Sequence, residues 1–195
     1  WGQRVACGVP SDDPEPEVGD LPEHRIHPLL FGSDALPFPV PGMSDVMPYP
    51  STRWSAMTDG QLAAYRRAWD GHLRILVDLF RPDVIHCHHL WIVGSIMKDV
   101  APDTPVVSHC HATGFRQMQL CPQLEAEVRA GCASLQAYAV LHRAHRQQLP
   151  APVHRHRRHR EHRRAPVFSF LQPRWAMALA AIPLFVLGAR WLVPS

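Results

Sequence analysis

This sequence lacks the even set of cysteines that is typical of a disulfide-bonded domain. The chain has five cysteines, an odd number, scattered through a sequence without repeats: Cys7, Cys87, Cys110, Cys121 and Cys132. Small secreted domains carry an even set of disulfide-bonded cysteines, so this pattern argues against that class. The first residues also lack a signal peptide, which is a basic stretch followed by an apolar one. We therefore expect reduced thiols and a cytoplasmic protein. Because no start methionine precedes Trp1, we also expect an N-terminal truncation.

Acidic residues are nearly absent from the last quarter of the chain. Residues 143–195 contain one acidic residue and 10 arginines, whereas residues 1–142 contain 16 acidic and 10 basic residues. Residues 154–164, from His154 to Arg164, are six arginines, four histidines and one glutamate. Such a stretch cannot bury a core. We expect an α/β domain over residues 1–149 and an irregular basic and apolar tail over residues 150–195.

A long apolar run is missing as well. Residues 175–189 are uncharged, but the run contains Pro183 and is followed by Arg190, and a membrane-spanning helix needs roughly 20 apolar residues. The tract from His154 to Arg164 would attract anionic surfaces in a salt-dependent way, with no specificity for a nucleic acid. Three alternatives stay open for the tail: it is disordered, it is read out of frame, or it associates with a membrane.

Short apolar runs alternate with amphipathic stretches over the rest of the chain. The pattern predicts strands at residues 5–9, 25–31, 83–88, 105–110 and 136–141, and helices at about residues 58–81, 91–100 and from Pro122. The stretch after Cys110 is expected to be a loop. Strands that alternate with helices predict a Rossmann-like, doubly wound and mostly parallel sheet with helices on both faces.

Histidines stand where two of these strands end. His88 and His89 close one strand, and His109 and His111 close the next. Ligands of open α/β sheets bind outside the carboxyl ends of the strands. The sequence therefore predicts a site at this edge, whereas His86 is expected to be a packing residue.

These strands carry a family resemblance that covers about residues 1–145. The stretch RPDVIHCHHLW, which begins at Arg81, is similar to a strand of glycosyltransferase family 4, and VVSHCHATG, which begins at Val106, is similar to a later strand that ends in histidine and small residues. The chain resembles the acceptor-side, N-terminal half of these enzymes, which have two Rossmann-like domains (the GT-B fold).

The resemblance implies transfer of a sugar from a nucleotide-sugar donor to a hydroxyl acceptor without a further cofactor. It implies that His111 lies near the reacting sugar as the catalytic residue, and that His88 and His89 contact the substrate. Thr113 and Gly114 would form a turn that a ligand can approach. Arg116 is a nearby cation that could meet a phosphate.

The chain also departs from the family pattern. The first strand and its glycine-rich loop would precede Trp1, and no pair of glutamates at an eight-residue spacing follows residue 127. We therefore expect a fragment, truncated at both ends, that lacks turnover by itself.

A metal-binding module is the alternative from a different class. Its ligands would come from imidazole and thiolate groups, which suit zinc: His88, His89, His109, Cys110, His111 and Cys121. Against it, the cysteines at 110, 121 and 132 stand eleven residues apart, and Cys110 and His111 would point to opposite faces of a strand. The favoured prediction therefore contains no metal.

Overall fold

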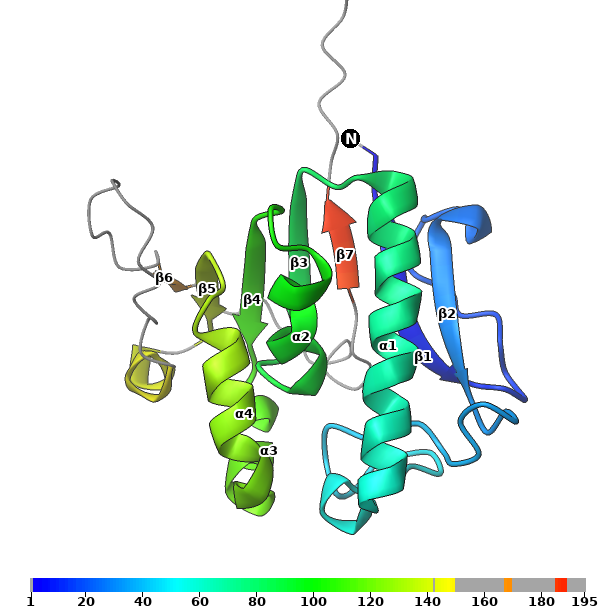
Figure 1. The fold of residues 1–195 in the computed structure, drawn as a ribbon, viewed down its shortest axis with the longest axis horizontal. Helices are drawn as coiled ribbons and strands as arrows, with labels where there is room; N and C mark the ends of the chain where they lie inside the picture. Colours follow the sequence, from blue (N-terminus) through cyan, green and yellow to red (C-terminus); the bar gives the residue numbers. More distant parts are fainter. Residues whose placement is uncertain (1, 142, 150–166, 170–184, 189–195) are drawn as a thin grey trace, which may run out of the picture.

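A computed structural model describes residues 2–141, 143–149, 167–169 and 185–188 (Figure 1). Its strands are β1 (Arg4–Pro10), β2 (Ile26–Phe31), β3 (Val84–His88), β4 (Val106–Cys110), β5 (Ala137–Val140), β6 (Val167–Ser169) and β7 (Phe185–Gly188). Its helices are α1 (Asp59–Phe80), α2 (Ile92–Val100), α3 (Ala112–Leu120) and α4 (Pro122–Cys132), with 3-10 turns at Glu23–Arg25, Trp54–Ala56 and Arg143–Gln148.

The strands lie in the order β2-β1-β7-β3-β4-β5-β6. β1 and β2 form one parallel pair, and β3, β4, β5 and β6 form a second parallel group. β7 lies between the two and runs antiparallel to both β1 and β3. The prediction of an α/β protein with parallel strands is confirmed, and the five strands predicted before residue 142 all form.

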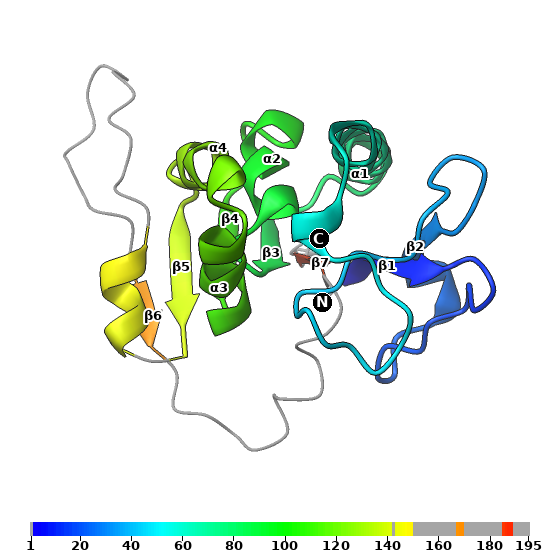
Figure 2. The ribbon, with the colours of Figure 1, turned by 90° about the horizontal axis from the view of Figure 1, so that it is seen from below.

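Helices α1, α2 and α4 pack on the same face of the sheet. Figure 2 shows α1, α2 and α4 side by side above the strands, and their apolar residues form one core with the residues of β3 and β4 that point the same way, such as Ile85 and Cys110. Trp69 of α1 is fully buried in this core. Helices were expected on both faces, so the grouping of these three on one face departs from the expectation.

Helix α1 begins and ends as its sequence predicts. The hydroxyl of Thr58 accepts a hydrogen bond from the amide of Gln61, whose side chain accepts one from the amide of Thr58. The helix ends at Arg81, whose φ of 47° lies in the left-handed region, because Pro82 cannot continue it.

Replacing the capping threonine should weaken the fold measurably. Thr58→Ala removes the side-chain acceptor for the amide of Gln61, and loss of such a cap costs about 1 kcal/mol of the free energy of unfolding. Urea denaturation measures this difference. Arg67→Ala, on the exposed side of the same helix, is the control and should change stability by less than about 0.5 kcal/mol. Equal losses in the two variants would contradict the capping role.

The loop expected after Cys110 is instead helix α3. Phe115 and Met118 of α3 are buried in the main core, and the helix ends at Cys121, before Pro122. Burial of one face of this stretch outweighs the poor helix propensity of Gly114 and Thr113. The residues predicted to form a binding turn therefore occupy the first turn of a helix.

Most of the tail from residue 150, including residues 154–164, lies outside the described residues. The described parts are β6 and β7, which pair with β5 and with β1 and β3. Among the helices of the described part, none has the length and apolar composition needed to cross a bilayer.

Candidate functional site

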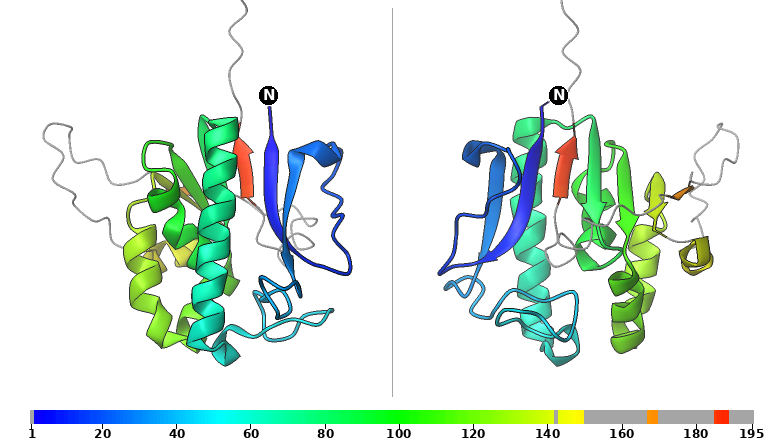
Figure 3. Two further views of the ribbon diagram at one scale, coloured as in Figure 1. Left: turned by 45° about the vertical axis from the view of Figure 1, so that its right-hand side comes forward. Right: turned by 180° about the vertical axis from the view of Figure 1, so that it is seen from behind.

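Four histidines share one face of β3 and β4. His88 pairs in register with His109, and His86 pairs with Val107. Because residues two apart point to the same face of a strand, His86, His88 and His109 lie together, and His111 follows at the end of β4. Figure 3 (right) shows this side of the sheet, with α1 behind the strands. We call His86, His88, His109 and His111 the histidine cluster.

The imidazole rings of the histidine cluster are in direct contact. The centroids of the rings of His109 and His111 lie 4.4 Å apart and the rings are stacked, and those of His86 and His88 lie 4.7 Å apart. A polar contact joins His88 Nδ1 to His111 Nε2 at 3.2 Å. The cluster is therefore a continuous group of nitrogen ligands and hydrogen-bonding groups across two strands.

Burial keeps these histidines neutral. It lowers the pKa of His88 to about 3, with a further contribution from the neighbouring histidines His86, His111 and His109. It also lowers the pKa of His86 and of His111 to about 4, and it lowers the pKa of His109. At neutral pH each ring can therefore donate one hydrogen bond and accept another, or bind a metal through its lone pair.

His89 closes β3 in an unusual backbone conformation. Its φ is 67°, in the left-handed region that residues other than glycine rarely adopt, and its side chain is buried. The Nδ1 of His89 lies 3.0 Å from the hydroxyl of Thr113, and the centroid of its ring lies 4.7 Å from that of His111. Backbone strain of this kind is common at functional sites.

Gly114 is needed for packing at this junction. A Cβ atom at Gly114 would lie 3.0 Å from the carbonyl oxygen and 3.1 Å from the amide nitrogen of Leu90. The glycine therefore lets the first turn of α3 lie against the connection between β3 and α2. The atoms that lie close to Gly114 are backbone atoms of Leu90.

Two helix N-termini flank the cluster. α2 starts after Trp91 and α3 starts after His111, and neither N-cap side chain hydrogen-bonds to its helix. Both helices begin at the carboxyl ends of parallel strands. The partial positive charge of helix N-termini at such an edge favours polar and anionic ligands.

One small hollow lies beside His88 and His89. Met43, from the long connection between β2 and α1, lines a hollow of about 10 Å³ together with His88, His89 and Trp91. A larger hollow of about 700 Å³ lies at the carboxyl ends of β1 and β2, where Phe38 and Tyr49 contribute to its lining.

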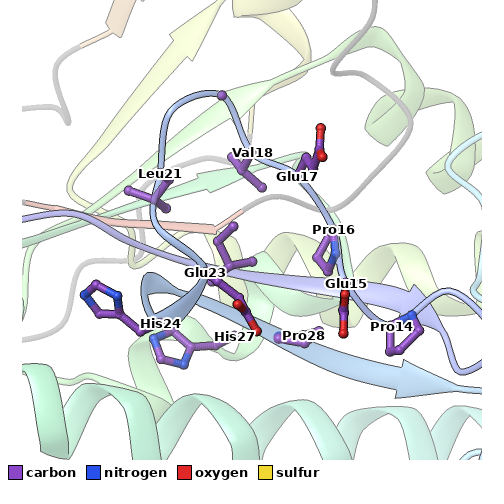
Figure 4. A pocket seen from close by; sticks show the side chains of 12 residues that line it. Pro14, Glu15, Pro16, Glu17, Val18, Leu21, Glu23, His24, His27 and Pro28 are labelled. Carbon is purple, nitrogen blue, oxygen red and sulfur yellow. The ribbon is translucent and has the colours of Figure 1, made fainter.

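A further hollow is lined by none of the predicted site residues. It has a volume of about 940 Å³ and is lined by the loop before residue 24 and by the start of β2 (Figure 4). Glu15, Glu17 and Glu23 give it an acidic character, and none of the histidines of β3 and β4 lines it.

The structure brings together four of the six predicted site residues. His88, His89, His111 and Thr113 are linked by the contacts above. Gly114 is buried, and Arg116 is exposed on α3, where it lines a hollow of about 350 Å³ together with Thr113.

His86 was expected to be a packing residue, but its ring contacts those of His88 and His109. The two-residue spacing from 86 to 88 places both histidines on one face of β3, and this signal was sufficient to group His86 with the histidines expected at this edge. Cys110 instead points to the helix side and is fully buried, as is Cys121. The mixed set of histidine and cysteine ligands is therefore not assembled.

Comparison with protein families, with curated proteins and with solved structures finds no match for this chain.

Proposed function

We propose that this chain is the acceptor-side half of a glycosyltransferase of family 4, in which a sugar moves from a nucleotide sugar to a hydroxyl acceptor. The observation that carries the proposal is the meeting of His88 and His89, at the end of β3, with His111, at the end of β4. The two sequence stretches that resemble the family supply these residues, and the stretches meet at the carboxyl edge of the parallel strands.

His111 has the properties that a positioning hydrogen-bond donor needs. It lies between a strand and the first turn of α3, so its backbone is held on both sides. Its lowered pKa keeps the imidazole neutral. A neutral ring can orient a sugar hydroxyl and stabilise charge that develops in the transition state without titrating near neutral pH.

The leaving nucleoside diphosphate would bind at the N-termini of α2 and α3. The amides of the first turns of α2 and α3 point to the same edge as the histidines, and an anion there is stabilised by the partial charge of each helix. Arg116 lies on α3 and could pair with a phosphate that extends beyond this edge.

The acceptor would bind toward β1 and β2. The hollow of about 700 Å³ at their carboxyl ends has the apolar surface of Phe38 and the carboxylates of Asp12 and Asp13 in its lining. Such a combination suits a sugar, which has apolar C–H faces and many hydroxyl donors. The sheet would then be the acceptor-side half of a GT-B enzyme.

Binding of sugar ligands tests this proposal on the chain itself. The imidazole signals of the full chain are followed by NMR during titration with UDP-glucose, GDP-mannose, glucose and mannose. We expect at least one of these to shift the ring signals of His88 and His111 at concentrations up to about 10 mM, the range of weak ligand binding. His111→Ala should abolish the shifts at His88.

The exposed His24, outside the cluster, provides the control. His24→Ala should leave the shifts at His88 and His111 unchanged, because His24 lies before β2 and outside the site. If all four ligands leave the cluster signals unmoved, or if His111→Ala leaves the shifts at His88 unaltered, the proposed sugar site is wrong.

A further inference from the structure

We propose that His88, His109 and His111 form a binding site for one divalent transition-metal ion, of which Zn²⁺ is the best match. This site is separate in principle from sugar transfer and rests on the geometry of the three side chains alone. One ligand atom from each of the three lies within 4.8 Å of the other two. The metal would be held by nitrogen atoms from two adjacent strands of one sheet.

The distances suit tetrahedral coordination by imidazole. Zinc–nitrogen bonds of about 2.0–2.1 Å at tetrahedral angles place neighbouring ligand nitrogens roughly 3.4 Å apart. His88 Nδ1 and His111 Nε2 already lie 3.2 Å apart. The third ligand, His109, is stacked on His111 with the ring centroids 4.4 Å apart, and one of its nitrogens lies within 4.8 Å of those of His88 and His111, so its ring has to rotate to reach a shared ion.

The strands hold the ligands in place. His88 and His109 are register partners in the parallel pair β3 and β4, and His111 follows two residues later at the start of α3. Ligands carried by strands are positioned more accurately than ligands on loops, which lowers the cost of organising the site. Three protein ligands also leave a fourth position for water or a substrate, as in zinc sites with three histidines.

The choice of metal follows from the ligands. All three are imidazoles, which favour Zn²⁺, Co²⁺, Ni²⁺ and Cu²⁺, whereas Mg²⁺ and Ca²⁺ require oxygen ligands.

The histidines of the tract from His154 to Arg164 must be replaced before metal binding at the histidine cluster is measured. Its four histidines, His154, His156, His159 and His162, could also bind transition metals. We therefore use the full chain with these four replaced by glutamine as the reference protein. Zn²⁺ is titrated into it by calorimetry, and one equivalent is expected to bind with a Kd of about 1 μM or tighter.

Single replacements test the ligand set. His88→Ala, His109→Ala and His111→Ala should each weaken Zn²⁺ binding by at least about 100-fold, more than the loss of an outer-sphere partner causes. His24→Ala is the control, because His24 is an exposed histidine that lies before β2 and outside the histidine cluster. The affinity of His24→Ala for Zn²⁺ should stay within about threefold of that of the reference protein.

Spectra of the metal-bound reference protein identify the metal ligands even if a variant fails to fold. The Co²⁺ form of the reference protein should show a tetrahedral spectrum without a sulfur-to-cobalt charge-transfer band, and X-ray absorption of its Zn²⁺ form should give three imidazole ligands. Absence of binding to the reference protein at 100-fold the expected Kd, a thiolate ligand in the spectra, or unchanged affinity in the three ligand variants would each overturn the proposal. None of these outcomes decides whether sugars bind.

Discussion

Lowering the pH from 7.5 to 4.5, in the presence of a chelator, is expected to unfold this protein cooperatively. The pKa values of His86, His88 and His111 are lowered to between about 3 and 4 in the folded protein, mainly by burial. In the unfolded chain a histidine titrates near 6.5. Between these values the unfolded state binds more protons than the folded state, so acid favours unfolding.

The sign and the size of this effect follow from the same values. The histidines contribute their full stability above about pH 6.5, and this stability is lost as the pH falls toward 4 and below. A pKa difference of one unit corresponds to about 1.4 kcal/mol. For His111, which is 8% exposed, the difference is worth about 3 kcal/mol, a large share of the roughly 5–15 kcal/mol that stabilises a typical domain.

Urea denaturation at a series of pH values measures this loss. His86→Phe removes one titrating ring while keeping a ring of similar size, so it should flatten the dependence of stability on pH between 6.5 and 4.5. His24→Gln changes an exposed histidine outside the cluster and should leave that dependence unaltered. A free energy of unfolding that stays constant from pH 7.5 to 4.5 would show that the cluster is not buried as described.

The sequence predicted the elements whose signals are local. Helix α1 has a capping box at its start, apolar residues at three- and four-residue steps and a proline after its end, and all three features appear in the structure. β3 and β4 are short apolar runs, and each forms within one residue of its predicted start. Their parallel pairing brought His88 close to His111, as expected for neighbouring strands.

The sequence did not predict what depends on long-range packing. The stretch from Ala112 to Leu120 contains a threonine and a glycine that favour a turn, yet it is helical because Phe115 and Met118 are buried in the core. The side of the sheet on which each helix packs is also a property of the whole chain. The sequence pattern of the strands also does not predict that Gly114 packs against the backbone of Leu90.

The contact between α2 and α4 should be the most sensitive position to a single added methyl group. A Cβ atom at Gly131 of α4 would lie 2.8 Å from the Cβ of Ser95 in α2, closer than such atoms approach in proteins, and would also collide with the Ser95 carbonyl. Gly131→Ala is therefore expected to lower the free energy of unfolding by about 1–3 kcal/mol, as overpacking does.

The same replacement at Gly71 should act in the opposite direction. Gly71 lies on the exposed side of α1, and a Cβ atom there would meet nothing within 4 Å. Alanine is the better helix former, so Gly71→Ala should stabilise the protein by about 0.5–1 kcal/mol. Urea denaturation of the two variants should thus give changes of opposite sign, although the chemical change is identical.

Gly131→Ala should also disturb the histidine cluster. The new methyl group must push α2 away from α4, and α2 starts two residues after Leu90, next to the strained His89. The imidazole signals of His89 and of His111, whose rings are in contact, should therefore move in the NMR spectrum of Gly131→Ala and stay in place in that of Gly71→Ala. If Gly131→Ala stabilises the protein as Gly71→Ala does, the two helices do not cross as closely as the structure shows, and the position of α2 does not control the geometry of the site.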